Sequence, residues 1–140
     1  MAIRWTPLLA VGVDSIDSEH QVLFSVANRL LEAMRSNSAE VPQLLVELEA
    51  VALEHLAFEE SIMAETGYPG LEEHRASHAA LRCELAGLRG EHDGSGMTDV
   101  LAHRTNDFVC AWLLDHISGE DRDLGSWLTR LNQRGARAAG

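Results

Sequence analysis

The chain has 140 residues, which is enough for one domain with a sizeable core. Its net charge is −11 and all 11 basic residues are arginine, so repulsion of phosphates argues against binding to nucleic acid or to an anionic membrane. No apolar run is long enough to span a bilayer, and residues 1–10 lack the pattern of a signal peptide. We therefore expect a cytoplasmic protein in which Cys83 and Cys110 are reduced.

The N-terminal part of the chain predicts an extended arm and then a first helix. Residues 1–17 have no helical period, and we expect them to pack across the other elements as an arm. Ser18 is expected to cap the first helix. Apolar residues then recur at helical spacing from His20 to Met34, and the polar run 35–40 ends this helix.

Two further helices are predicted in the middle of the chain. The second begins at Val41–Pro42, where proline suits a first turn, and ends at about Glu65. Residues 66–70 combine threonine, glycine, tyrosine and proline and predict a turn. The third helix covers about 71–90, and glycines within 93–96 predict the next loop.

The C-terminal part predicts a fourth helix from Met97 to Ile117 and then a short helix around 124–131. Residues 134–140 are expected to be a frayed tail. Four helices with short connections indicate an all-α protein, an up-down-up-down four-helix bundle with an N-terminal arm and a short C-terminal helix. We expect residues 1–140 to form a single domain.

Potential metal ligands occur in each of the four predicted helical segments: His20; His55 and Glu59; His74 and His78; His116 and Asp121. The second and third groups flank the turn near Tyr68. His55 and Glu59 lie 13 and 9 residues before it. His74 and His78 lie 6 and 10 residues after it, so a rise of about 1.5 Å per residue places both pairs at overlapping heights. The other two loops place His20 and His116 at the same level.

The spacing within each pair decides which way the side chains point. His55 and Glu59, like His74 and His78, are four residues apart and share one helix face, which is also the apolar face. His116 and Asp121 are five residues apart, which rotates them by about 140° on a regular helix. The sequence therefore predicts a break or bulge between them, and residues 118–119, Ser-Gly, are a suitable place for it.

Ordinary core histidines are the alternative interpretation of this pattern. Five histidines at one height with two carboxylates favour a metal site instead, because a buried carboxylate without a partner would be costly. His92 and His103 lie outside the pattern and are expected to be solvated, with no role.

The donor set exceeds the four ligands of one zinc ion and suits two octahedral ions. A zinc-protease motif is absent, because Arg75 follows His74 where that motif has glutamate. No glutamate stands three residues before any histidine, which excludes the ferritin-like dimetal motif.

These motifs resemble those of the hemerythrin family, in particular the single-domain bacterial members. Residues 55–60 with Met63, residues 67–69, and the pair His74 and His78 resemble the central motif of that family. Residues 112–117 with Asp121 resemble its C-terminal motif, and residues 13–20 resemble the entry to its first helix. The resemblance covers roughly residues 5–130.

The resemblance implies a centre of two iron ions. His74, His78 and His116 would bind one ion, and His20 and His55 would bind the other. Glu59 and Asp121 would bridge the two, together with an oxo or hydroxo group. This leaves one position open on the second ion, where dioxygen would bind.

Reversible binding of oxygen needs a dry pocket, and five apolar residues near the expected ligands are candidates for its lining: Leu23, Phe24, Leu56, Leu113 and Ile117. They would serve equally as ordinary core. Family members often carry phenylalanine at the position of Leu56, so this residue is expected to alter the volume of the pocket.

Oxygen carriage, storage or delivery is the function that this resemblance favours, with dioxygen as the ligand, no nucleic-acid or membrane partner, and a monomer as the expected state. Delivery would need an oxygen-consuming recipient, which the sequence does not identify. The alternatives are a diiron enzyme acting on peroxide or nitric oxide, and an oxygen or iron sensor. An enzyme would need a proton donor in the pocket, which the sequence does not indicate, because Tyr68 is expected to be remote in the turn. A sensor would need a signalling domain.

Overall fold

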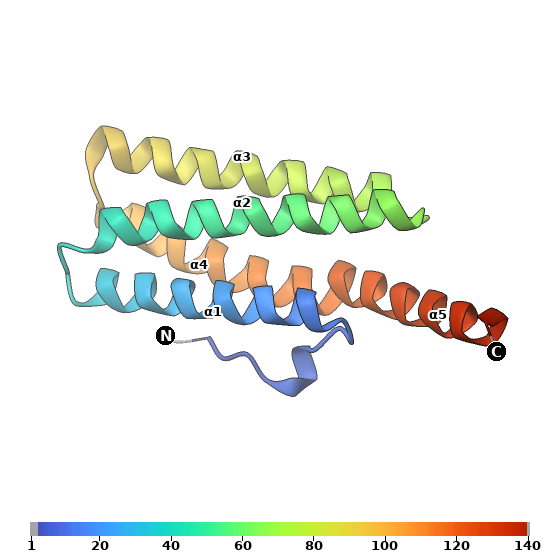
Figure 1. Cartoon of the computed structure of the whole chain (residues 1–140). Coiled ribbons are helices and arrows are strands. Elements are labelled where there is room, and N and C mark those ends of the chain that lie inside the picture. Colours follow the sequence, from blue (N-terminus) through green and yellow to red (C-terminus); the bar gives the residue numbers. More distant parts are fainter. Residues whose placement is uncertain (1–2, 140) are drawn as a thin grey trace.

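The computed structural model describes residues 3–139, with side chains as far as residue 135. Its elements are a 3₁₀ turn η1 (Pro7–Leu9), helices α1 (Asp14–Arg35), α2 (Val41–Thr66), α3 (Leu71–Ser95) and α4 (Asp99–His116), a π-helix η2 (Ile117–Asp121) and helix α5 (Arg122–Ala139). Helices α1 to α4 pack side by side as the expected four-helix bundle, and α5 continues the line of α4 beyond its end (Figure 1). No strand occurs within residues 3–139. No helix in this part of the chain is long and apolar enough to cross a membrane.

Helix α1 begins earlier than predicted. It starts at Asp14, so Ser18 lies inside the helix and does not cap it, and the arm ends at Val13 instead of residue 17. Asp14 and Asp17 lie in the first turn, where the helix dipole stabilises negative charge. Asp17 Oδ1 also accepts a hydrogen bond of 2.8 Å from the backbone N–H of Val11. The first turn therefore carries negative charge but has no side-chain cap.

The arm runs along α1 and is attached near both of its ends (Figure 1). Asn28 holds the first described residue, since the Ile3 N–H donates to Asn28 Oδ1 at 2.9 Å and Asn28 Nδ2 donates to the Ile3 carbonyl at 2.6 Å. Farther along, Val11 packs directly on Gly125 of α5: a Cβ at Gly125 would lie 2.1 Å from the Val11 carbonyl oxygen. The arm therefore joins α1 to α5.

Replacing Gly125 with alanine should separate the arm from α5, because the new methyl group would collide with backbone and not with a flexible side chain. We expect a loss of roughly 1–3 kcal/mol in the free energy of unfolding, as for other overpacked sites. Urea unfolding monitored by circular dichroism measures it. Gly90 is a matched control within α3, where an added Cβ meets nothing within 4 Å. Gly90→Ala should stabilise by up to about 1 kcal/mol. Equal effects of the two substitutions would contradict the proposed contact.

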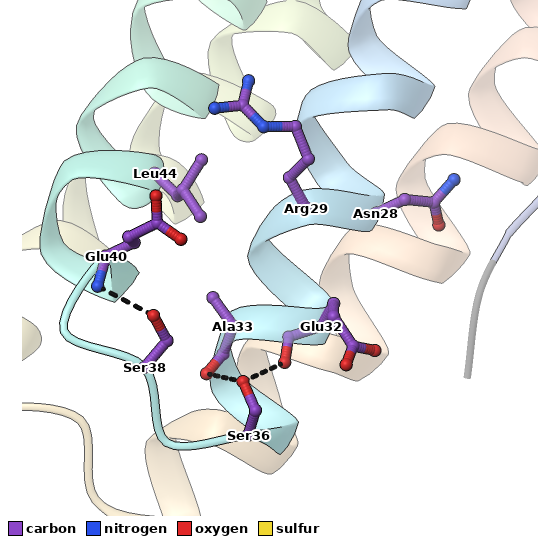
Figure 2. Close-up of a pocket in the computed structure, with 8 residues that line it drawn as sticks. All are labelled: Asn28, Arg29, Glu32, Ala33, Ser36, Ser38, Glu40 and Leu44. Atoms are coloured by element: carbon purple, nitrogen blue, oxygen red, sulfur yellow. Dashed lines mark hydrogen bonds between the residues drawn. The ribbon is translucent and has the colours of Figure 1, made fainter.

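The turns at the two ends of α2 have different structures. Gly67 ends α2 with a φ of 71°, and the backbone N–H of Tyr68 reaches the Met63 carbonyl at 3.0 Å, which confirms the predicted turn at 66–70. In the α1–α2 connection, Ser38 Oγ accepts the Glu40 N–H at 3.1 Å (Figure 2). A surface pocket of about 350 Å³ lies there and contains none of the seven predicted ligands.

Helix α3 is longer than predicted, because it continues through Gly90 to Ser95 and leaves only Gly96–Thr98 as the loop. Contacts with neighbouring helices support the extension: Arg89 Nη1 donates to Glu49 of α2 at 2.8 Å, and Arg104 of α4 pairs with Glu91. Helix α4 then begins at Asp99 and not at Met97, because the Thr98 hydroxyl caps it by accepting the Leu101 N–H.

The C-terminal helix is also longer than predicted. Helix α5 has 18 residues and follows η2 without a break. The π-helix keeps the backbone hydrogen-bonded, so the chain does not need a loop at residues 118–119. The residues expected to fray from Arg134 onward are helical as far as Ala139, and Gly140 lies outside the described residues.

Candidate metal centre

All seven predicted ligands converge inside the bundle. Helix α1 contributes one of them, α2 and α3 two each, α4 one and η2 one, in the order His20, His55, Glu59, His74, His78, His116 and Asp121. Each is buried, and the most exposed, His116, shows only 8% of its surface. Histidines and carboxylates from four helices and the π-helix therefore share one interior region.

The donor atoms form two overlapping groups, within each of which they lie no more than 4.8 Å apart. The larger group contains His74, His78 and His116, and the smaller contains His20 and His55. Glu59 and Asp121 belong to both groups. The arrangement is therefore one of three and two histidines around two shared carboxylates.

The two oxygens of Asp121 face different groups. Oδ1 lies 3.0 Å from His74 Nε2 and 3.1 Å from His116 Nε2. Oδ2 lies 2.9 Å from His20 Nε2 and 3.9 Å from His55 Nε2. One carboxylate thus extends across the gap between the groups, as a bridging ligand would.

Glu59 spans the two groups in a different way. Its Oε1 lies 3.3 Å from His78 Nε2 and 3.4 Å from His55 Nε2, which belong to different groups. Its Oε2 lies 3.9 Å from His20 Nε2. Both carboxylates are therefore within reach of both sets of histidines.

Distances between histidine nitrogens fit a metal ion better than a hydrogen-bond network. His20 Nε2 and His55 Nε2 are 3.1 Å apart, and His78 Nε2 and His116 Nε2 are 3.2 Å apart. An octahedral first-row ion that holds its donors at about 2.1 Å separates neighbouring donors by about 3.0 Å. The nitrogens are already spaced as neighbouring ligands of one ion.

The buried carboxylates have histidine nitrogens nearby but no well-directed hydrogen bond from them. None of the four oxygens of Glu59 and Asp121 has a hydrogen bond of acceptable geometry within the described part of the chain, and neither does His74 Nε2. Two buried carboxylates without such partners are costly. A pair of divalent ions would neutralise and coordinate them, so the residues present fit the dimetal centre that the sequence predicts.

The π-helix places Asp121 in the centre. Hydrogen bonds in a π-helix join residues five apart, so His116 and Asp121 can face the same side although a regular helix would separate them. The bulge that the sequence predicts at residues 118–119 is confirmed, and it occupies Ile117–Asp121.

Three carboxylates contact the outer nitrogens of the predicted ligands, and the sequence reasoning missed all three. Glu19 Oε1 lies 2.6 Å from His55 Nδ1, Glu60 Oε2 lies 3.1 Å from His78 Nδ1, and Glu120 Oε1 lies 3.6 Å from His116 Nδ1. The two shorter contacts, from Glu19 and Glu60, fix a histidine with its Nδ1 protonated and its Nε2 free to bind metal. All three directly adjoin predicted ligands in the sequence (His20, Glu59 and Asp121), which is a signal that could have identified them.

The carboxylates make the metal-free site strongly basic. Burial lowers the pKa of His55, but the contacts with Asp121, Glu19 and Glu59 outweigh it and raise this pKa to about 11. For His74 and His116, burial is likewise outweighed by Asp121 and Glu59, and their pKa values rise to about 9 and about 10. Burial raises the pKa of Asp121, but the surrounding histidines outweigh it and hold it well below its usual range. Without metal, protons would occupy the positions of the ions.

This charge pattern predicts how the stability of the metal-free protein depends on pH. The ordinary histidine pKa is 6.5, and the raised values are about 9 to about 11, so these histidines stabilise the fold fully below about pH 6.5. That stabilisation should disappear as the pH rises through about 9 to 11. Chemical unfolding of chelator-treated protein across this range measures it. Metal-loaded protein is the control, because bound ions keep the imidazoles neutral over this range. A metal-free protein whose stability is constant from pH 6.5 to pH 10 would contradict the prediction.

The five residues predicted to line a pocket are all buried in the core: Leu23, Phe24, Leu56, Leu113 and Ile117. The two remaining histidines and the two cysteines belong to neither donor group. The His103 side chain is 79% exposed, as expected, but the expectation that His92 is solvated is wrong. Its side chain is only 13% exposed and lines a surface pocket near the α1–α2 connection. Cys83 and Cys110 are unpaired.

The expectation that Tyr68 is remote is wrong. Its ring lies edge-on to His74, with a centroid separation of 6.5 Å, and also 5.4 Å from the ring of Trp127 on α5. The tight end of α2 turns the chain back at Gly67, which brings the aromatic ring over the first turns of α3.

Comparisons with known proteins agree with this arrangement. Residues 11–128 match the family described as the hemerythrin HHE cation binding domain. A bacteriohemerythrin of Stenotrophomonas maltophilia is 32% identical over 120 residues, covering 84% of this chain and 76% of that protein. Myohemerythrin of Riftia pachyptila is 32% identical over 117 residues, covering 84% of this chain and 86% of that protein. A crystal structure of a hemerythrin with a leucine-to-tyrosine substitution superposes with a TM-score of 0.82 at 26% identity, covering 90% of this chain and 97% of that one. The chain therefore belongs to the hemerythrin family.

Proposed function

We propose that this protein binds dioxygen reversibly at a pair of iron ions, for carriage, storage or delivery of oxygen. His74, His78 and His116 would hold one ion, His20 and His55 the other, and Glu59 and Asp121 both. The observation that supports this most directly is that two carboxylates belong to two donor groups at once. The smaller group has one imidazole fewer, so oxygen would be taken up on that side.

The protein around the ions would then keep the site dry. When bound, the iron pair supplies the two electrons that dioxygen binding requires. Leu23, Phe24, Leu56, Leu113 and Ile117 are at most 3% exposed, and they would exclude the water and protons that promote irreversible oxidation. The same side chains also pack the core, and the two roles are compatible.

The positions of the neighbouring acids favour binding over turnover. Glu19 and Glu60 contact the outer Nδ1 atoms of His55 and His78, whereas the Nε2 atoms face the centre. An enzyme that protonates bound oxygen would need an acid on the inner side. Glu59 and Asp121 are there, but as ligands they would carry no proton.

Tyr68 supports a second candidate, a diiron enzyme that reduces peroxide. Its ring lies 6.5 Å from that of His74, within range to exchange electrons with the centre. If this function holds, Tyr68→Phe should abolish peroxide turnover and leave the metal content unchanged. A carrier should tolerate the same substitution.

An optical spectrum recorded through repeated cycles of oxygenation and deoxygenation tests the proposal. A charge-transfer band should appear with oxygen, disappear when oxygen is removed and return at full intensity. Irreversible loss of the band in the first cycle, or rapid consumption of added peroxide, would favour the enzyme.

A further inference from the structure

The two outermost carboxylates of the centre differ in their own surroundings. Glu19 of α1 contacts His55 Nδ1 at 2.6 Å, and within the part of the chain that the structure describes this is its one ion pair. It is 36% exposed and lines a small surface hollow of about 150 Å³ together with Val22, Val51 and Glu54. Its negative charge is therefore directed at His55.

Glu60 of α2 has more than one partner. Its Oε2 lies 3.1 Å from His78 Nδ1 and also accepts a hydrogen bond of 2.5 Å from Arg82 Nη2. Its Oε1 lies 3.5 Å from Arg75 Nε. The carboxylate is only 16% exposed, so water screens these contacts less than those of Glu19. Two guanidinium groups thus share the charge that Glu60 presents to His78.

This difference is relevant because a carboxylate on the outer nitrogen makes an imidazole a stronger donor to metal. An arginine bound to the same carboxylate reduces this increase in donor strength, since the carboxylate then shares its charge with the guanidinium. His55 belongs to the group with two histidines, and His78 belongs to the group with three. The contact at His55 is also the shorter one, 2.6 Å against 3.1 Å at His78, so the stronger support reaches the group that has fewer imidazoles despite the greater exposure of Glu19.

We propose that Glu19 is a positioning residue that strengthens metal binding in the two-histidine group, and that Arg82 and Arg75 restrain the corresponding effect of Glu60 in the three-histidine group. This inference rests on the proposed dimetal centre. It adds that the two ions are supported unequally by residues that do not touch them, and that a carboxylate on α1 compensates for the missing histidine.

Cobalt(II) titrated into the metal-free full-length protein, in competition with a chelator, tests the proposal. Cobalt reports each site by its visible absorption and shifts the exchangeable Nδ1–H proton signals of its histidine ligands. Glu19→Gln removes the charge but keeps an acceptor for the His55 N–H. We expect it to raise the dissociation constant of one of the two cobalt ions by about 10- to 100-fold and to leave that of the other within about twofold of wild type.

Two further variants test the contact of Glu60 with His78 and the effect of Arg82 on it. Glu60→Gln should raise the dissociation constant of the other cobalt ion by less than about tenfold, because the charge of Glu60 is already shared with the arginines. Arg82→Gln should tighten that ion and shift the His78 Nδ1–H signal downfield, as a stronger hydrogen bond to Glu60 requires. A purely structural role for Arg82 would move neither quantity in this direction.

Matched controls are available for both kinds of substitution. Glu54 lines the same hollow as Glu19, and Arg89 is on the same helix as Arg82 and pairs with Glu49 at 2.8 Å. Glu54→Gln and Arg89→Gln should leave the dissociation constants of both cobalt ions unchanged. Circular dichroism of the metal-free variants establishes that each one folds.

The outcomes separate this inference from the proposed function. Equal weakening by Glu19→Gln and Glu60→Gln, or an effect of Glu19→Gln no larger than that of Glu54→Gln, would overturn the inference and leave the centre intact. A wild-type protein that binds fewer than two cobalt ions would instead refute the dimetal centre itself.

Discussion

Replacing Glu59 with alanine should remove both metal ions from the protein. Glu59 is fully buried, and its oxygens lie near histidines of both donor groups. As a shared ligand it would serve both ions and give the pair one negative charge, so its loss would leave two buried divalent ions with a single carboxylate and weaken the binding of both. We expect the iron content, measured by mass spectrometry, to fall from two per chain to well below one. The oxygen-dependent absorption band should disappear with it.

A second substitution and a control make this result specific. His78 belongs only to the larger donor group, so His78→Ala should weaken the binding of one ion and leave the iron content between one and two per chain. Glu84 is exposed on α3, and Glu84→Ala should keep two ions. Full loading of the Glu59→Ala protein would be incompatible with the assigned ligands.

Replacing Leu113 with alanine should make the oxygenated protein short-lived. Leu113 is buried one helical turn before His116, and truncation leaves a cavity beside the centre that admits water. We expect oxidation of the iron pair to accelerate by about tenfold or more, which corresponds to at least about 1.4 kcal/mol in the barrier. The decay of the oxygen-dependent band in air measures this rate.

Leu101 is the matched control for that experiment. It is fully buried in the same helix but near its other end, far along the chain from His116. Leu101→Ala should destabilise the fold by roughly 2–5 kcal/mol, as should Leu113→Ala. Only the substitution at Leu113 should change the oxidation rate. Equal rates in the two variants would mean that general loosening, and not a dry pocket, controls oxidation.

Much of the centre could be predicted because it depends on distances along single helices. The spacing of His55 and Glu59, and of His74 and His78, fixes their common faces, and the turn at residues 66–70 fixes their common height. The irregularity before Asp121 could be predicted as a break or bulge for the same reason, since a separation of five residues between His116 and Asp121 does not put both on one face of a regular helix. The role of all seven as ligands remains a proposal that the experiments above test.

Other features could not be predicted because they depend on contacts between helices. Glu19 is adjacent to His20 in the sequence but contacts His55 on α2, which requires the relative rotation of two helices. The early start of α1 depends on Asp17 binding the arm, and the length of α3 depends on partners such as Glu49. Tyr68 lies beside His74 only because the turn folds back over α3. Spacing within one helix contains none of this information.

The continuity of α4, η2 and α5 has a mechanical consequence. The three elements form one rod whose irregular segment ends at Asp121, so a change in the geometry of this segment would tilt α5 relative to α4. The 18 residues of α5 form a lever about 27 Å long, and a tilt of about 10° at the joint would move its far end by about 5 Å. Val11 packs on Gly125 only four residues beyond the joint, and the ring of Trp127 lies 5.4 Å from that of Tyr68, so both contacts resist such a tilt. The far end of α5 is therefore where a distance probe would register a small movement of Asp121 with the greatest amplification.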